Sequence, residues 1–227
     1  MAKVSKKYKE ALEMYDKNKE YALDEAIEIL KKFPKAKFDE TIDVSIKLKL
    51  NKSQRVRGVV SLPNSFGKPR KVVVIAKGEK AIEAEKAGAD FVGDTDIIDK
   101  IKKGWLDFDA VIATPDMMKD VGKLGPILGR RGLMPNPKTG TVTFDVAQAV
   151  ADIKKGKFEF RSDKDGVVAL GVAKVSMDND KIKENIKAFY DAVVKIRPAD
   201  LKGEYIKSVT ISKTMSPGVK VDKETLK

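Results

Sequence analysis

Hydroxyl side chains form a regular row near the carboxyl end of the chain. The row consists of Ser208, Thr210, Ser212 and Thr214. Val209 and Ile211 lie between them, and this period of two is typical of a β-strand with one packed and one solvated face. Because hydroxyl groups both donate and accept hydrogen bonds, such a row suits contacts to ribose 2′-hydroxyl groups and phosphates. An exposed strand of good β-forming residues gives the same pattern, so the row alone leaves both interpretations open.

Two short segments extend this candidate surface. The four residues after the row, which begin with Met215 and Ser216, are predicted to turn sharply and to present backbone groups. Lys37, Phe38 and Thr41 form a second polar edge, in which the ring of Phe38 offers a stacking surface. A phenylalanine at this place also fits a position in a hydrophobic core.

A glycine-rich, acid-free segment at residues 122–143 is the third candidate. It contains five glycines, three prolines and four cations, which are Lys123, Arg130, Arg131 and Lys138. Long segments without secondary structure are usually functional or disordered, and glycines let backbone N–H groups approach an anion. We expect a loop that contacts phosphate, with a flexible solvated excursion as the alternative. Apolar residues such as Leu124 and Leu128 predict that the loop is partly packed.

The charge of the chain favours a polyanionic partner. The 227 residues include 46 Lys plus Arg and 34 Asp plus Glu, for a formal net charge of +12, which suits a nucleic acid or an anionic membrane surface. Residues 67–157 hold 17 of the basic and 13 of the acidic side chains, so +4 lies there and +8 lies in the two terminal segments. Residues 122–143 account for that whole +4.

Missing residue types and motifs argue against catalysis. The chain has no cysteine and no histidine, which removes thiolate nucleophiles, the commonest general base and the commonest metal ligands. It also lacks a phosphate-binding loop of the GxxxxGK[ST] type and a dinucleotide fingerprint. We therefore expect no enzyme activity, no cofactor and no metal site. Since no signal-peptide pattern and no apolar run of ~18 residues is found, we expect a soluble cytoplasmic protein without membrane contact.

The two ends of the chain share one style of secondary structure. Alternating polar and apolar side chains predict antiparallel strands at residues 41–50, 55–62, 157–161, 167 onward and 204–213. The sequence Asp-Lys-Asp-Gly at 163–166 predicts a tight turn, with the strand after it returning as the second half of a hairpin. Apolar residues at helical spacing over 182–196 predict a core-facing helix that ends before Pro198.

The middle of the chain alternates apolar strands with charged helices. Strands are predicted at 72–76, 90–92 and 110–113, and helices at 79–87, 96–103 and 146–154. This alternation predicts βαβ units and a small parallel sheet. The fold class is therefore α/β combined with α+β. We expect an antiparallel split β-α-β domain, built from residues 1–66 and 158–227, that receives a three-layer, Rossmann-like parallel α/β domain of residues 67–157.

Several strings resemble one known family. In chain order they are AKFDET at 36–41, VRGVV at 56–60, GADFVG at 88–93, ATPDMM at 113–118, GLMPNPK at 132–138, FRSDK at 160–164 and KTMSP at 213–217. Together they make nearly the whole chain similar to the bacterial family of large ribosomal subunit protein one, the protein of the mobile stalk beside the tRNA exit site.

The resemblance implies an RNA-binding ribosomal protein. It implies that the terminal domain grips a kinked helix of large-subunit rRNA and that the stalk moves with deacylated tRNA as it leaves. It also implies that free protein, monomeric off the ribosome, binds its own operon's mRNA and represses its translation. The RNA-contacting residues carried over are Lys37, Phe38, Thr41, Arg161, Asp163, Lys164, Gly166, Ser212, Thr214, Met215 and Ser216. From the acid-free segment we expect secondary RNA contacts by Arg130, Arg131 and Lys138.

Four positions depart from the family's pattern. Ser216 stands where the family usually has glycine, so its side chain would affect any close approach of the backbone to RNA. Asn64 and Ala169 stand where the family usually has histidines, and Arg130 replaces a usual proline and adds a charge to its segment.

Two other classes of function compete with RNA binding. One is a nucleotide- or sugar-phosphate-binding α/β enzyme, because parallel sheets often bind ligands at the carboxyl ends of their strands. The other is a basic scaffold for protein interactions. An RNA binder with several phosphate contacts loses orders of magnitude in affinity between ~50 and 200 mM salt, whereas an enzyme of this kind is stabilised against heat by a small ligand.

Overall fold

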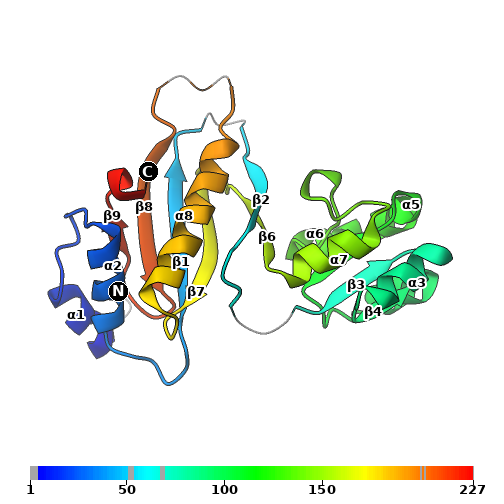
Figure 1. The fold of residues 1–227 in the computed structure, drawn as a ribbon, viewed down its shortest axis with the longest axis horizontal. Coiled ribbons are helices and arrows are strands. Elements are labelled where there is room, and N and C mark those ends of the chain that lie inside the picture. The colour runs from blue at the N-terminus through cyan, green and yellow to red at the C-terminus, as the bar shows by residue number, and fades with distance from the viewer. Residues whose placement is uncertain (1–4, 51–53, 67–69, 200, 202, 227) are drawn as a thin grey trace. The chain divides into compact units, whose positions relative to one another are not determined.

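The computed structural model describes residues 5–50, 54–66, 70–199, 201 and 203–226, without the side chain of Lys138 (Figure 1). The chain forms two compact units. One comprises residues 1–67 and 158–227, and the other comprises residues 68–157. We call them the terminal unit and the inserted unit. The domain boundary predicted at residue 67 lies outside the described residues.

A four-stranded antiparallel sheet forms the centre of the terminal unit. Its strands are β1 (Thr41–Leu48), β7 (Val167–Lys174), β8 (Ile206–Lys213) and β9 (Val219–Val221). They lie in the order β7-β1-β8-β9, so β1 from the first part of the chain is flanked by two strands from the last part. The prediction ended the strands at residue 213, and β9 was missed because three residues give too short a pattern to read.

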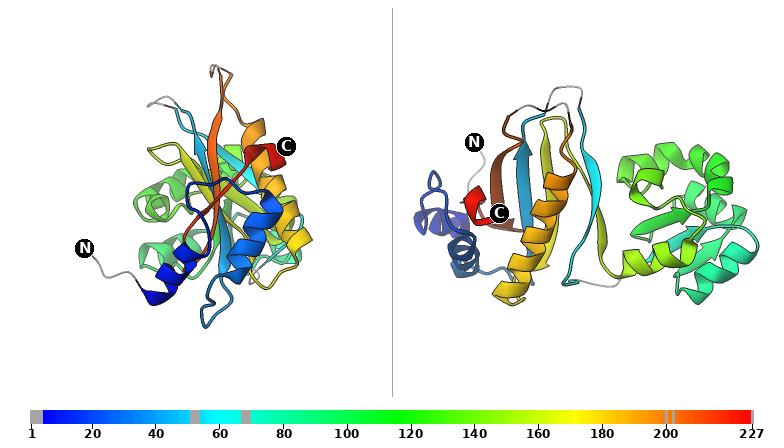
Figure 2. Two further views of the ribbon diagram at one scale, coloured as in Figure 1. Left: turned by 90° about the vertical axis from the view of Figure 1, so that its left-hand side faces the viewer. Right: turned by 45° about the horizontal axis from the view of Figure 1, so that its top comes forward.

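The helices of the terminal unit share one hydrophobic core with this sheet. They are α1 (Lys6–Glu13), α2 (Leu23–Lys32) and α8 (Asn179–Lys195), with a 3-10 turn, η4 (Lys223–Leu226), near the end. α2 and α8 bury their apolar sides against the inward residues of β1 and β8, through side chains such as Leu30, Ile186 and Phe189. Figure 2 shows both helices on the same side of the sheet. The opposite face of the sheet therefore keeps its polar side chains.

A separate two-stranded sheet corrects the predicted hairpin. It pairs β2 (Arg57–Ser61) with β6 (Lys157–Arg161), and α8 packs against β2. The turn after β6 forms as predicted. The segments on its two sides are joined by the isolated β-bridge between Ser162 and Val168, and β7 then pairs with β1 and not with β6. The hairpin was wrong because alternation identifies a strand without identifying its partner.

The inserted unit is a three-layer α/β domain with a parallel sheet. Its strands, in spatial order, are β4 (Phe91–Gly93), β3 (Val72–Ile75) and β5 (Ala110–Ala113). Its helices are α3 (Glu79–Lys86), α4 (Thr95–Lys102), α5 (Met118–Val121), α6 (Gly125–Arg131) and α7 (Val146–Lys154), with 3-10 turns η1 (Pro115–Met117), η2 (Gly122–Leu124) and η3 (Pro137–Thr139). β3 is buried on both faces because α3 and α7 cover one side and α4 with α6 cover the other.

The acid-free segment is not the long loop that its glycines predict. Its first part forms η2 and α6, and Leu124 and Leu128 are fully buried in the inserted unit's core. Each helical glycine costs ~1 kcal/mol relative to alanine, so burial of these two leucines outweighs local propensity. Pro126 is compatible with the helix because it lies in the first turn, where its missing N–H has no partner in any case. The predicted partial packing is confirmed.

The described part of the chain contains neither a membrane-spanning helix nor a cluster of metal ligands. None of its helices is both long and apolar enough to span a bilayer. Within the same residues, no group of three or more Asp and Glu side chains is arranged to hold a metal ion.

Candidate nucleic-acid interface

The register of β1 and β8 sets two polar rows side by side. Ser45 lies opposite Thr210, Asp43 opposite Ser212, and Lys47 opposite Ser208. Together with Thr41 and Thr214 at one end, these side chains form what we call the polar face: Thr41, Asp43, Ser45, Lys47, Ser208, Thr210, Ser212 and Thr214. All of them are partly or fully solvent-accessible. The structure therefore joins the hydroxyl row to a second row that lies more than 160 residues earlier in the chain.

One carboxylate lies within this face. Partial burial raises the pKa of Asp43, and the nearby Lys174 ammonium offsets only part of that rise. Gly171 lies opposite Asp43 on β7, where a Cβ atom would be 3.1 Å from the Asp43 carboxylate. A carboxylate repels phosphate. Asp43 therefore disfavours a phosphate at its own position on the polar face.

Thr41 and Thr214 close one end of the polar face. The Thr41 backbone N–H donates to Thr214 Oγ1 at 3.0 Å, and the Thr214 N–H donates to the Thr41 carbonyl at 3.1 Å. The Thr41 hydroxyl accepts a hydrogen bond from Lys174 Nζ at 2.8 Å. Both threonines are thus held in place before any ligand arrives, which lowers the entropic cost of recognition.

Phe38 and Met215 lie beside a common hollow next to this end. The hollow has a volume of about 170 Å³, and its walls include Phe33, Ala36 and Ser216. The side chains of Phe38 and Met215 are 55% and 66% exposed, so Phe38 is a surface residue and not part of the core. We call this site the Phe38 hollow. It brings together residues predicted from two distant segments.

A buried ion pair fixes both segments of the Phe38 hollow. Lys213 Nζ lies 3.1 Å from Glu40 Oε1, with the two side chains 1% and 3% exposed. The same ammonium donates to the carbonyls of Phe33 and Pro34, both at 3.1 Å. Burial alone would raise the pKa of Glu40, but hydrogen bonds from the Ala36 N–H, Lys213 and the Met215 N–H outweigh it and lower that pKa. The pair therefore ties the end of α2, the 36–40 segment and the turn after β8 together.

Ser216 fits its turn without backbone strain. Among the described residues every positive φ belongs to a glycine, so this position does not need glycine's left-handed conformation. Its hydroxyl accepts from the Lys213 N–H at 3.1 Å, and its own N–H donates to the Lys213 carbonyl at 3.0 Å. The departure from the family's usual glycine is thus accommodated within the turn itself.

A basic hollow lies at the other end of β1. It has a volume of about 460 Å³ and is lined by Arg55, Val56, Arg57, Arg161, Ser162, Asp163 and Lys164. We call it the Arg161 hollow. Four of its seven residues are cationic and one is anionic, and Glu159 forms an ion pair with one of the four, Arg57. A surplus of guanidinium groups around a concave surface suits the binding of phosphates.

The turn beside this hollow depends on Asp163 and Gly166. Asp163 Oδ1 accepts from the Asp165 N–H at 2.9 Å and from the Val167 N–H at 2.7 Å. Gly166 has φ +76°, and a Cβ atom there would lie 3.0 Å from the Leu48 carbonyl oxygen. These two predicted site residues therefore shape the turn that presents Arg161 and Lys164.

The remaining predicted residues line neither hollow and do not belong to the polar face. Lys37 is exposed on the 36–40 segment. Arg130 and Arg131 are exposed at the end of α6 in the inserted unit, and the side chain of Lys138 lies outside the described part of the structure. Of the departing positions, Ala169 is exposed opposite Ser45 on β7.

Asn64, where the family usually has histidine, is occupied with α8. Its backbone N–H donates to Asn185 Oδ1 at 3.0 Å, and its side-chain amide donates to Glu184 Oε2 at 2.7 Å. Asn64 therefore fastens the segment after β2 to the helix layer.

Sequence reasoning missed four residues of this region. Glu40 comes just before β1, on the same inward side as Ile42, and Lys213 ends β8, on the same inward side as Ile211. Ionisable residues at inward positions indicate a buried ion pair. Arg55 and Arg57 stand two residues apart, on the strand face opposite Val56, and this spacing places two cations together.

The arrangement combines three kinds of contact. The polar face offers hydroxyl groups, the Phe38 hollow offers exposed apolar side chains, and the Arg161 hollow offers cations. The two hollows lie at opposite ends of β1, whose eight residues span ~24 Å. Hydroxyls, stacking surfaces and cations are the contacts that structured RNA requires.

Comparisons with known proteins identify a family and close relatives. The model of the ribosomal protein L1p/L10e family matches residues 30–217. The large ribosomal subunit protein uL1 of Borreliella burgdorferi (strain B31) is 57% identical over 222 residues, which cover 98% of both chains. The proteins of the same name from Borrelia hermsii and Borreliella afzelii are 57% and 55% identical over the same length.

Proposed function

The chain belongs to the ribosomal protein L1p/L10e family, and from this premise we propose that its terminal unit binds large-subunit rRNA through the polar face and the two hollows. As a member of this family it is a structural constituent of the large ribosomal subunit and not an enzyme. The observation that carries the proposed site is the register of β1 and β8, because it sets two polar rows side by side, with the Phe38 hollow next to one end of β1 and the Arg161 hollow near the other.

We assign different tasks to the parts of this surface. The arginines and lysine of the Arg161 hollow neutralise phosphates and supply salt-dependent affinity. The hydroxyls of the polar face read ribose and phosphate oxygens, and Met215 and Phe38 pack on bases or sugars. Asp43 adds a repulsive contact that opposes RNA shapes whose phosphates approach the middle of the face.

We further propose that this stalk protein assists release of deacylated tRNA and represses translation of its own operon. The support for both roles is the family resemblance. The proposed site is compatible with the repressor role, because a surface that recognises an rRNA shape would also bind an mRNA segment of the same shape. Free rRNA would then compete with the mRNA for one monomeric protein.

Footprinting on large-subunit rRNA tests the site. The wild-type protein should protect one region, and Thr214→Val or Met215→Ala should weaken that protection at physiological salt. Met14→Ala is a matched control for the second variant, since Met14 is 54% exposed on the C-cap of α1 and lines neither hollow. If both site variants protect rRNA as well as the wild type does, the assignment to the terminal unit is wrong.

The same variants separate the repressor proposal from the rRNA proposal. Met215→Ala should reduce affinity for the operon mRNA and for rRNA by the same factor, and unlabelled rRNA should displace the mRNA. A variant that loses rRNA binding but keeps mRNA binding would show that the two RNAs use different surfaces.

A further inference from the structure

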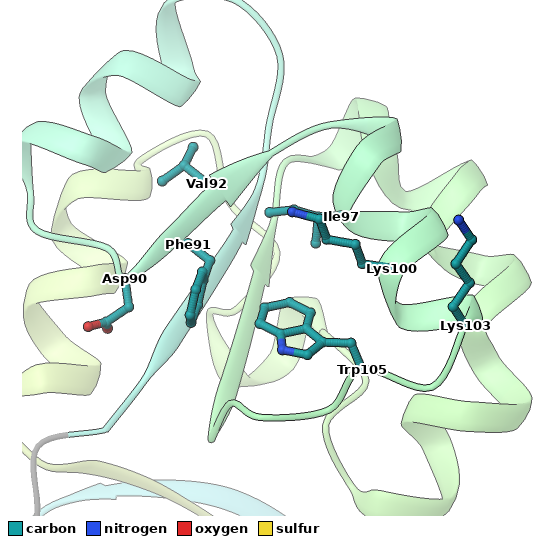
Figure 3. Close-up of a pocket in the computed structure, with 7 residues that line it drawn as sticks. All are labelled: Asp90, Phe91, Val92, Ile97, Lys100, Lys103 and Trp105. Carbon is teal, nitrogen blue, oxygen red and sulfur yellow. The ribbon is translucent and has the colours of Figure 1, made fainter.

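The inserted unit has a hollow that none of the proposed RNA contacts uses. It has a volume of about 620 Å³ and lies along the edge strand β4 and helix α4 (Figure 3). It is lined by Asp90, Phe91, Val92, Ile97, Lys100, Lys103 and Trp105. The hollow lies beside the amino end of β4 and not at the carboxyl ends of the strands, where parallel α/β enzymes bind their ligands.

Two aromatic rings form a corner inside this hollow. Phe91 points from β4 toward Trp105, with 4.8 Å between the ring centroids and 83° between the ring planes. Trp105 also packs on the buried Phe108, at a centroid distance of 5.3 Å. The corner is therefore anchored to the core, while Phe91 remains 38% exposed. A planar group that enters it can lie on one ring and meet the other with its edge.

Two lysines of the α4 region line the hollow outside the corner. Lys100 extends from α4 past Ile97, on the side of the rings, whereas Lys103 lies just beyond the end of the helix with its side chain directed away from the rings (Figure 3). Neither ammonium forms a hydrogen bond or an ion pair with a residue that the structure describes, and the nearby Asp99 pairs with Lys102 instead. These two cations are therefore available to an anionic ligand.

The carboxylate of Asp90, which lines the hollow, has partners within the inserted unit. Asp90 Oδ2 accepts from the Val72 N–H at 2.9 Å and lies 3.8 Å from Lys154 Nζ. The hollow thus presents an aromatic floor and a net positive rim.

We propose that this hollow binds one unstacked nucleotide of RNA, with its base in the Phe91–Trp105 corner and its phosphates beside Lys100 and Lys103. Aromatic rings next to cations are the usual way in which proteins hold single-stranded nucleic acid. An acidic peptide would also match the charge, but β4 has only three residues, too few to pair with an added strand. The site goes beyond the proposed function, which places rRNA on the terminal unit.

Fluorescence offers a local test, because Trp105 is the only tryptophan of the chain. Titration of the full-length protein with a single-stranded uridine hexanucleotide should quench Trp105, since a stacked base changes the ring's surroundings. Phe91→Leu should weaken the affinity at least about fivefold, the lower limit expected when a stacked aromatic is removed. Lys100→Ala with Lys103→Ala should reduce the slope of log affinity against log salt by roughly 1.4, for two phosphate contacts on a single strand.

Phe144→Leu is the matched control, since Phe144 is 55% exposed in the same unit but does not line the hollow. It should bind the hexanucleotide as the wild type does. Absence of quenching, or equal affinities for the wild type and Phe91→Leu, overturns the proposal. A shift of Trp105 emission caused by an acidic amphipathic peptide and not by the hexanucleotide would identify a protein-binding groove in its place. Footprinting of rRNA with the Met215→Ala variant tests the terminal unit by itself. The proposal for the terminal unit and the proposal for this hollow can therefore be refuted independently.

Discussion

Breaking the Glu40–Lys213 ion pair should destabilise the terminal unit by ~3–5 kcal/mol. At 3.1 Å and an effective dielectric constant of about 20, the attraction between the two charges is roughly 5 kcal/mol. The cost of removing both charges from water is of similar size, so the pair as a whole contributes little. Glu40→Gln, however, removes the attraction and leaves the Lys213 ammonium buried without a counter-charge. It also sets an amide where the Met215 N–H now finds a carboxylate oxygen.

Denaturant unfolding of the full-length chain measures this effect. Circular dichroism reports both units, whereas Trp105 fluorescence reports the inserted unit, whose transition should not move. A loss of 3–5 kcal/mol corresponds to a decrease in melting temperature of roughly 12 to 20 °C, at ~4 °C per kcal/mol. Glu28→Gln is the control, because Glu28 pairs with Lys32 at 3.8 Å on an exposed helix surface, where such a pair contributes only ~0.3–0.5 kcal/mol.

A double-mutant cycle decides whether the two residues act as a pair. Glu40→Gln with Lys213→Met removes both charges, so the double variant should be ~2 kcal/mol more stable than the sum of the single effects. Additive effects would refute the reasoning, because they would show that neither charge depends on the other. A decrease of less than ~1 kcal/mol in the free energy of unfolding of Glu40→Gln would also refute the reasoning, since an ammonium buried without a counter-charge costs more than that.

The contribution of Glu40 to folding stability depends on pH in a defined direction. Because the pKa of Glu40 in the folded chain lies below its ordinary value of 4.5, ionised Glu40 stabilises the folded state. That contribution is complete above about pH 4.5 and is lost as the pH falls through the lower folded pKa. The stability difference between the wild type and Glu40→Gln should therefore be constant near neutral pH and shrink in acid. A difference that grew in acid would contradict the assigned direction.

Three further predictions concern other parts of the molecule. Gly166→Ala should destabilise the chain by roughly 1–3 kcal/mol, because it forces a side chain to a φ of +76° and against the Leu48 carbonyl; an unchanged melting temperature would contradict this. Asp43→Asn should strengthen rRNA binding about fivefold by removing a repulsion of ~1 kcal/mol, and weaker binding in a filter assay would show that the carboxylate makes a favourable contact. Replacement of Arg130 and Arg131 by alanine should lower the salt slope by about one per arginine, and an unchanged slope would show that α6 touches no phosphate.

The sequence predicts local structure well where one periodicity persists. The alternation in residues 41–48 gives β1 and its inward and outward sides, and the middle of the chain gives each βαβ element. Strand pairing was harder, because β1 pairs with β8 across more than 160 residues and nothing local encodes that choice. The same limit explains the error at β6, which turns toward β7 but pairs with β2.

The error over residues 122–131 has a different cause. Glycine and proline predicted a loop, but Leu124 and Leu128 fall on one side of a helix and fill the inserted unit's core. Local propensity is worth about 1 kcal/mol per glycine, while full burial of a leucine is worth about 1.5–3 kcal/mol. Tertiary packing therefore decided the conformation, and the apolar spacing was the better guide.

Net charge indicated the class of partner without locating the surface. The polar face carries one acid and one base, Asp43 and Lys47, so it is neutral although the chain has a charge of +12. The cations gather in the Arg161 hollow, and phosphate contacts of that kind raise affinity for any RNA. We therefore expect discrimination between RNAs to come from the neutral hydroxyl rows and from the Met215 turn that Glu40 and Lys213 hold. Under the proposed assignment, the buried ion pair would affect RNA recognition without touching RNA, because it positions the Met215 turn.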